Sequence, residues 1–151
     1  MDPYSLRLLE TCRQVVGSWL DRAFDRVAVT QSLTASVDAD FRRLAVERAT
    51  VRALEDLTSL FSLDVVAQRT NPLDILRRST GSVTEELQRL GASPVERDEF
   101  HVRSFPSDIF GLCPATWADI DEALVEPGLE WGAFKAASVI QRRREQSESQ
   151  P

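Results

Sequence analysis

Apolar residues in the N-terminal part of the chain recur every three or four positions, which is the spacing of one face of an α-helix. The first stripe follows Asp2 and Pro3, a residue pair typical of a helix start. The second stripe runs from about Val37 to Leu63. It comprises Phe41, Leu44, Val51, Leu54, Leu57, Leu60 and Phe61. Two such helices joined by a short turn at residues 30–36 predict a long antiparallel helical hairpin.

Glycine and proline divide the rest of the chain into shorter predicted helices. Asn71 followed by Pro72 marks one helix start, and residues 79–81 (Ser-Thr-Gly) are expected to end that helix. Ser82 and Glu85 then form a capping box for a helix that ends before Gly91. Further helices are expected at Ser93 to about Val102, at Trp117 to Val125 and at Leu129 to about Glu145, with a turn at 126–128. No segment alternates as a strand does, so the predicted fold class is all-α.

Residues 104–115 are the exception to this helical pattern. Prolines and Gly111 prevent regular structure there, but Phe105, Ile109 and Phe110 provide apolar surface that can be buried. Disordered segments are poor in such residues. We therefore expect an ordered, irregular segment rich in proline and aromatic residues that packs on the hairpin.

The composition is that of an ordinary globular protein, with 42% hydrophobic and 28% charged residues. A chain of 151 residues is expected to form one domain, here residues 1–146, followed by a frayed tail at 147–151. It contains no apolar run near the roughly 18 residues of a membrane helix, and its N-terminus lacks the pattern of a signal peptide. We therefore expect a cytoplasmic protein that does not contact a membrane.

Negative charge is concentrated in residues 92–130. That segment holds nine acids against only Arg97 and Arg103, so it carries a net charge of −7 in a chain whose net charge is −6. All but one of the 18 basic residues are arginine, the exception being Lys135. Because arginine forms planar, bidentate pairs with carboxylates, we expect arginine–carboxylate networks across the helix faces.

The sequence contains no motif that is specific for catalysis, nucleotides or metals. His101 is the single histidine, and Cys12 and Cys113 are far apart, so zinc-ligand spacing and a Ser-His-Asp site are both absent. Asp119, Glu122 and Glu126 would share one face of the predicted helix, but a solvated acidic face explains them more simply than a metal site. We expect two free thiols and neither a metal nor a cofactor.

These observations favour a non-enzymatic interaction or regulatory protein, which presents the acidic aromatic segment 92–130 to a protein with a basic surface. Aromatic anchors dominate binding energy, and acids at the rim steer the encounter. The candidate partner-binding residues are Phe105, Asp108, Phe110, Trp117 and Asp121. A homodimer is also compatible with this pattern.

The alternative is a helical protein that binds a small molecule or cofactor in a pocket between the hairpin and the aromatic segment. Direct binding of nucleic acid is disfavoured, although residues 83–102 have the helix lengths of a helix-turn-helix motif. The second of those helices would carry Glu96, Asp98 and Glu99, which phosphate groups repel.

Overall fold

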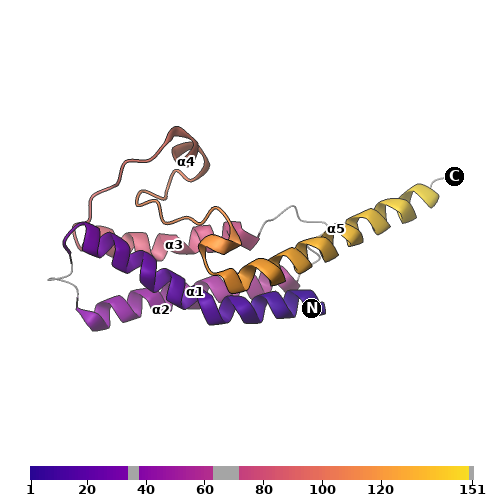
Figure 1. The fold of residues 1–151 in the computed structure, drawn as a ribbon, viewed down its shortest axis with the longest axis horizontal. Helices are drawn as coiled ribbons and strands as arrows, with labels where there is room; N and C mark the ends of the chain where they lie inside the picture. The colour runs from indigo at the N-terminus through magenta and orange to yellow at the C-terminus, as the bar shows by residue number, and fades with distance from the viewer. Residues whose placement is uncertain (34–37, 63–71, 150–151) are drawn as a thin grey trace.

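The computed structural model describes residues 1–33, 38–62 and 72–149. These ranges contain five α-helices and two short 3-10 helices, and no strand, so the all-α prediction is confirmed. Helices α1 (Pro3–Thr30) and α2 (Ala39–Ser62) lie side by side and run in opposite directions (Figure 1). The hairpin itself stays a prediction, because the turn expected at residues 30–36 falls partly outside the described residues.

Helix α1 begins as the sequence predicts. The Asp2 carboxylate accepts hydrogen bonds from the Ser5 amide at 2.8 Å and from the Ser5 hydroxyl at 2.6 Å, which caps the first turn. One face of α1 is then buried almost without interruption along the whole helix, and Leu8, Val16, Leu20 and Phe24 are fully inaccessible to solvent. This apolar face is the centre of the core.

Helix α2 packs through its alanines and not through the expected stripe of large residues. Ala45, Ala49 and Ala53 are fully buried, whereas Leu44 and Val51 are 44% and 49% exposed. The prediction was therefore wrong for Leu44 and Val51, whereas Leu54 is partly buried against the core. Small side chains let two helix backbones approach closely, so the shape of the contact outweighs the hydrophobicity of a single residue. Further along α2, the core contacts are Leu57, Leu60 and Phe61, as the sequence predicts.

Arginine–carboxylate pairs connect the long helices, as expected. Arg42 of α2 donates to the carboxylates of Asp21 and Asp25 of α1, each at 2.9 Å. Arg48 donates to Glu86 of α3 at 2.6 Å, and the Glu86 side chain is only 6% exposed. These pairs lie at the edges of the helix contacts, where they can fix the relative position of the helices along their axes.

Helix α3 (Pro72–Arg89) is continuous, so the predicted break at residues 79–81 and the predicted new start at Ser82 are wrong. Leu76, Thr80, Val83 and Leu87 are all buried along one face. Burial of that face stabilises the helix more than the exposed Gly81 destabilises it, since an interior glycine costs only about 1 kcal/mol. Asn71, the expected cap, lies outside the described residues.

The end of α3 was predicted correctly. Gly91 adopts φ +83°, a left-handed conformation that favours glycine. Its amide donates to the carbonyl of Gln88, and the next amide, of Ala92, donates to the carbonyl of Leu87, each at 3.0 Å. This pair of bonds is a Schellman motif, which satisfies carbonyls at the helix end and turns the chain away.

The chain after Gly91 contains less helix than predicted. Residues 93–98 are not helical, and α4 (Glu99–Ser104) begins five residues later than predicted, because its cap is the Asp98 carboxylate and not Ser93. The predicted helix at Trp117–Val125 is instead two 3-10 turns, η1 (Trp117–Asp119) and η2 (Glu122–Leu124). Asp121 starts the second turn by accepting a bond from the Ala123 amide, so it divides the expected helix in two.

Helix α5 (Val125–Glu148) includes residues 126–128, which were predicted to form a turn. Pro127 is tolerated because it lies in the first turn, where no helical hydrogen bond is lost. Gly128 is buried against Trp117, since a Cβ at that position would lie 2.7 Å from Trp117 Cδ1. The helix also continues to Glu148, beyond the predicted end at Glu145 and into the tail expected to be frayed.

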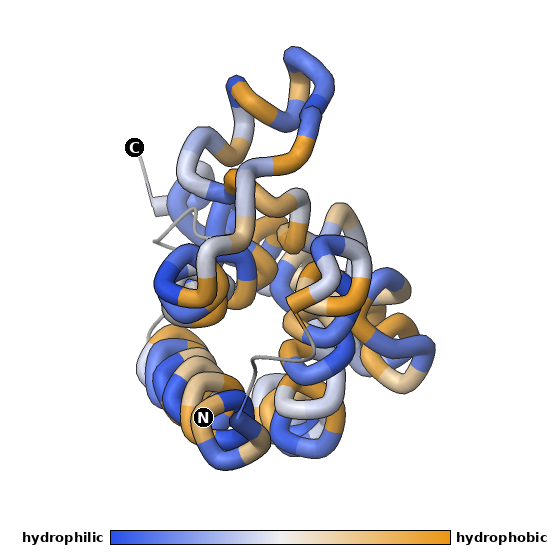
Figure 2. Tube along the Cα trace, turned by 90° about the vertical axis from the view of Figure 1, so that its left-hand side faces the viewer, coloured by the Kyte–Doolittle hydropathy of each residue, from blue (hydrophilic) through white to orange (hydrophobic). Residues whose placement is uncertain are grey.

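The start of α5 is fixed to the start of α1, and its second half extends beyond the other helices (Figure 1). Trp131 donates from its indole nitrogen to the Ser5 hydroxyl at 3.1 Å, and Lys135 donates to Asp2 at 3.0 Å. The rings of Tyr4 and Phe134 stack at 4.8 Å. Figure 2 looks nearly along the helices and shows that the chain carrying α4 stands apart from them.

Candidate functional site

Asp108 organises the irregular segment that connects α4 to η1. It is only 3% exposed, and its carboxylate accepts hydrogen bonds from the Leu112 amide at 2.9 Å and the Cys113 amide at 2.7 Å. The same carboxylate lies 2.9 Å from His101 Nε2. Burial raises the pKa of the Asp108 carboxyl, but these bonds outweigh burial, so its pKa lies below the ordinary 3.8. The group is therefore a structural anion.

Residues 95–104, which include α4, form a feature that we call the α4 protrusion. Arg97 points inward from it and donates to the carbonyls of Phe105 at 3.1 Å and Asp108 at 2.7 Å. The Val95 amide donates to the carbonyl of Ile109 at 3.0 Å. Together with His101, these bonds attach both ends of the protrusion to one irregular segment.

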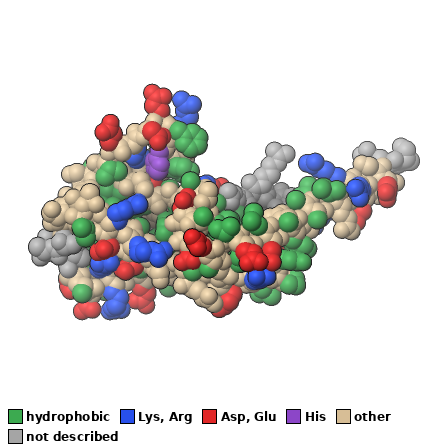
Figure 3. Space-filling model, in the orientation of Figure 1, with side chains coloured by type: hydrophobic (Ala, Val, Ile, Leu, Met, Phe, Trp, Pro, Cys, Tyr) green, Lys and Arg blue, Asp and Glu red, His purple; other side chains and the backbone are tan. Residues whose placement is uncertain are grey.

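The outer surface of the protrusion is both apolar and acidic. Phe100 is 75% exposed, and Val102 and Val95 are 44% and 36% exposed. Glu96, Asp98 and Glu99 are exposed beside them. Arg103 is the exposed base of the protrusion, since Arg97 points inward. Figure 3 shows acidic and hydrophobic side chains and the single histidine gathered on this part of the molecule.

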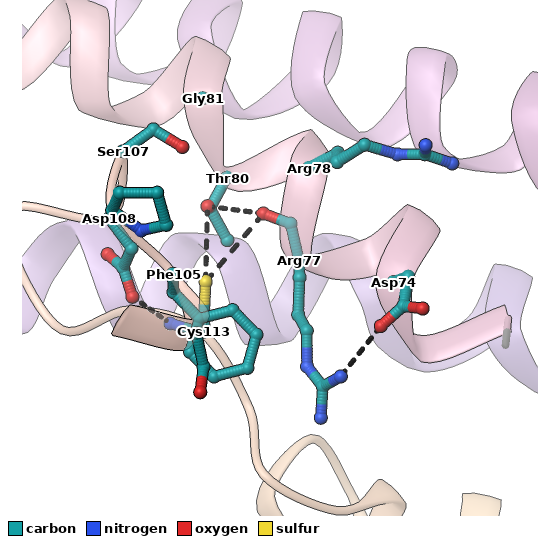
Figure 4. Close-up of a pocket in the computed structure, with 11 residues that line it drawn as sticks. Asp74, Arg77, Arg78, Thr80, Gly81, Phe105, Ser107, Asp108 and Cys113 are labelled. Atoms are coloured by element: carbon teal, nitrogen blue, oxygen red, sulfur yellow. Dashed lines mark hydrogen bonds and ion pairs between the residues drawn. The ribbon is translucent and has the colours of Figure 1, made fainter. Parts of the chain in front are cut away.

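A cavity of about 300 Å³ lies between α3 and residues 104–113 (Figure 4). The Arg77 guanidinium lies over the Phe105 ring at 4.8 Å and donates to the carbonyls of Pro114 and Ala115. Arg77 also pairs with Asp74 at 2.7 Å. Arg78 is exposed at the cavity and has no ion pair among the described residues.

Cys113 lines this cavity but is not activated. Its sulfur lies 3.9 Å from the Arg77 carbonyl oxygen and 4.0 Å from the Thr80 hydroxyl. Burial and the nearby Asp108 carboxylate raise the pKa of the Cys113 thiol from 9.0 to about 12. The thiolate is the nucleophilic form, so this cysteine is a poor nucleophile at neutral pH. Cys12 and Cys113 are both free thiols, as expected.

The five predicted partner-binding residues do not form one surface. Asp108 and Phe110 are each 3% exposed, so the expectation that they lie on the surface was wrong. Asp108 is buried because it accepts backbone bonds, and Phe110 because it belongs to the hydrophobic core. Phe105 is half-buried beneath Arg77. Trp117 is half-buried against Gly128, and Asp121 is occupied as the cap of η2.

Phe100 is the most exposed aromatic residue of the segment, but it is not among the five predicted partner-binding residues. The spacing within α4 contained a signal, because Phe100 follows two acids, Asp98 and Glu99, and the residues four and three positions before it are the charged Glu96 and Arg97. An aromatic residue with polar neighbours at helical spacing cannot join an apolar stripe. The missing information was that α4 is only one and a half turns long and stands apart from the core.

The predicted acidic face of Asp119, Glu122 and Glu126 does not exist, because these residues lie in η1, η2 and α5 respectively. Within the described ranges, no group of three or more His, Cys, Asp or Glu side chains is arranged to hold a metal ion. None of the described helices is sufficiently long and apolar to span a membrane. The chain shows no match to a known protein family, to a curated protein or to a solved structure.

Proposed function

We propose that this protein is an interaction protein whose α4 protrusion binds a protein partner with a basic surface. The observation that carries the proposal is Phe100, which is 75% exposed on a short helix flanked by acids. Large exposed aromatic side chains are the residues that most often anchor protein interfaces. The partner class is the one expected from the sequence, but the contact residues differ from those predicted.

Charge favours a basic partner. Glu96, Asp98 and Glu99 are exposed around the apolar residues, whereas the positive charge of Arg97 is directed at two carbonyl groups inside the segment. The surface offered to a partner is therefore more acidic than the sequence of the protrusion implies. Such a rim speeds association with a basic surface and disfavours acidic competitors.

The hydrogen bonds beneath the protrusion also favour binding. Asp108 connects His101 of α4 to the amides of Leu112 and Cys113. Arg97 also donates hydrogen bonds to two backbone carbonyls of the same segment. A helix of six residues has little stability by itself, so these bonds supply its order. A surface ordered before binding loses less conformational entropy when the partner arrives.

Capture from a native lysate with the immobilised protein tests this proposal. The wild-type protein should retain a basic protein at low salt, and Phe100→Ala should lose it. Leu6→Ala is the matched control, because Leu6 is 53% exposed on α1 and far in sequence from the protrusion. Retention of the same protein by Phe100→Ala would show that the protrusion is not the contact surface.

Association kinetics with the captured protein separate charge from apolar contact. Glu96→Lys combined with Glu99→Lys should slow association by about tenfold or more at low salt, and by less at high salt, because salt screens steering. Phe100→Ala should mainly speed dissociation. Association that is insensitive to both salt and charge reversal would contradict a basic partner.

The cavity between α3 and residues 104–113 supports a second candidate, the binding of a small anionic molecule. Asp74 pairs with Arg77, and the Asp108 carboxylate is directed at backbone amides and His101, so Arg78 is the charged side chain of the lining that has no such contact among the described residues. The Phe105 ring and the Arg77 stem provide apolar contact. An aromatic carboxylate has the matching chemistry.

Benzoate is a suitable probe for this second candidate. It should raise the melting temperature of the wild-type protein, and Arg78→Ala should abolish the increase. Arg52→Ala, an exposed arginine on α2, is the matched control and should leave the increase unchanged. Sodium chloride at the same ionic strength separates specific binding from screening. An equal effect of benzoate and chloride would exclude a benzoate-binding cavity.

A further inference from the structure

A second apolar stripe runs along the outer side of α5 and has no partner among the described residues. Its members are Leu129, Ala133, Ala136 and Ile140. Leu129 and Ile140 are 69% and 52% exposed, and both alanines between them are exposed. The spacing of four, three and four residues is that of a coiled-coil seam. Figure 3 shows a row of hydrophobic side chains along this helix.

The stripe is not the face that attaches α5 to the rest of the molecule. That attachment uses Trp131, Phe134 and Lys135, which contact Ser5, Tyr4 and Asp2. Beyond Lys135 the helix continues for more than three turns, away from the other helices (Figure 1). An exposed apolar seam on a helix that extends from the body is typical of a surface that pairs with another helix.

Charged residues continue the same seam at both ends. Glu126 lies three residues before Leu129, and Arg143 lies three residues after Ile140. Both are exposed, and neither forms an ion pair within the described residues. The seam therefore reads Glu, Leu, Ala, Ala, Ile, Arg, with opposite charges at its two ends and its smallest residues at the centre.

We propose that this seam pairs with the α5 helix of a second copy of the chain, antiparallel, in a two-fold symmetric dimer. Reversing the seam places Glu126 opposite Arg143, Leu129 opposite Ile140 and Ala133 opposite Ala136. Each charged residue then lies opposite one of opposite charge, and each apolar residue lies opposite one of similar size. The two-fold axis makes every such pair occur twice in the dimer. No other partner is needed to explain why the two ends of the seam carry opposite charges.

The geometry suits two copies. The seam from Glu126 to Arg143 is about 25 Å long at 1.5 Å per residue. Ala133 and Ala136 at the centre allow the backbones to approach closely, as Ala45, Ala49 and Ala53 do where α2 is buried. The extending half of each α5 would lie along the attached half of the other, with the two bodies at opposite ends. Two helices that meet only along a seam of this length form a small interface, so the dimer should dissociate at low protein concentration.

Sedimentation velocity and light scattering over a concentration series test the dimer. The wild-type chain should approach twice its mass of 17.0 kDa as concentration rises. Ile140→Glu should weaken the dimer by more than about tenfold, because it buries an unpaired charge. Leu44→Glu is the control, since Leu44 is a comparably exposed apolar residue on α2. A monomer at every concentration, or a dimer that Ile140→Glu leaves intact, would overturn the proposal.

Charge exchange tests the antiparallel arrangement. Glu126→Arg and Arg143→Glu should each weaken self-association, because each brings like charges together at both ends. Mixing the two variants should restore a dimer, since both ends of the mixed pair are then complementary. The double variant should also recover self-association. Circular dichroism shows whether α5 remains folded in each variant. Failure of the mixture and of the double variant to recover would exclude this pairing.

Discussion

Asp2 and Asp108 act in the same way at two distant places, because each carboxylate accepts at least one hydrogen bond from a backbone amide and also contacts a basic side chain. Asp2 caps α1 and pairs with Lys135, whereas Asp108 holds the amides of Leu112 and Cys113 and contacts His101. Both side chains connect segments that are far apart along the chain or irregular. At the residue scale, these two acids are structural, although sequence reasoning placed Asp108 on a binding surface.

Asp2 gives a pH-dependent contribution to stability. Burial raises the pKa of its carboxyl, but hydrogen bonds from Ser5 and Lys135 outweigh burial and lower the pKa from 3.8 to about 2. A carboxyl with a lowered pKa in the folded state stabilises the protein above its unfolded pKa and loses that contribution as pH falls through the folded value. The Asp2 contribution is therefore complete at neutral pH and declines between about pH 4 and pH 2.

Asp2→Ala should reduce the free energy of unfolding by about 1–2 kcal/mol at pH 7, the usual cost of losing an N-cap. Urea unfolding of both proteins from pH 7 to pH 2 should show the difference shrinking below pH 4. Lys135→Met removes the ion pair but keeps the cap, so it should cost less than Asp2→Ala. A difference of the same size at pH 2 and pH 7 would mean that the charge of Asp2 is not involved.

At the element scale, α2 shows which residues determine the buried face of a helix. The sequence offers large residues such as Leu44 and Val51, yet the alanine face is the one buried. Gly17 of α1 lies opposite Thr50 of α2, where an added Cβ would lie 3.5 Å from the threonine hydroxyl. That distance is ordinary van der Waals contact, so the small side chains that allow α1 and α2 to approach closely are the buried alanines of α2.

Ala49→Leu should destabilise the protein by about 1–3 kcal/mol, because it inserts three carbons into a fully packed site. Leu44→Ala, on the neighbouring exposed face, should change the free energy of unfolding by less than about 0.5 kcal/mol. Chemical denaturation of the two variants measures both values. If Leu44→Ala were the more damaging change, the buried face of α2 would be the one predicted from the sequence.

At the scale of the whole molecule, two features extend from the core of α1, α2 and α3: the α4 protrusion and the second half of α5 (Figure 1). They differ in how they are held. The protrusion depends on hydrogen bonds centred on Asp108, whereas α5 is a long helix attached by Trp131 and Lys135. The order of the α4 protrusion is therefore more sensitive to a single substitution than the order of α5.

Asp108→Ala should release residues 104–115 and, with them, the α4 protrusion. Limited proteolysis should cleave this segment rapidly in the variant and slowly in the wild-type protein. The order of the segment depends on buried amides that would lose their acceptor at a cost of about 1–3 kcal/mol each. Asp121→Ala is a suitable control, because Asp121 caps the separate turn η2. Rapid cleavage of the wild-type segment would contradict the predicted order.

The sequence by itself determined the features that depend on neighbouring residues. The all-α class, the cap at Asp2 and the left-handed turn at Gly91 follow from periodicity and from local backbone chemistry, and all are observed. These signals need no knowledge of distant contacts, because capping and turn formation involve residues within one or two helical turns.

Only the tertiary structure decided which local signals were overruled and which residues remain exposed. The break expected at Gly81 is absent because one face of α3 is buried, and the turn expected at 126–128 is helical because Trp117 packs on Gly128. Contacts between distant segments also explain why Asp108 is buried and structural, and the absence of such contacts explains why Phe100 is exposed. Burial depends on contacts between segments far apart in the sequence, and those contacts can outweigh local preferences of about 1 kcal/mol.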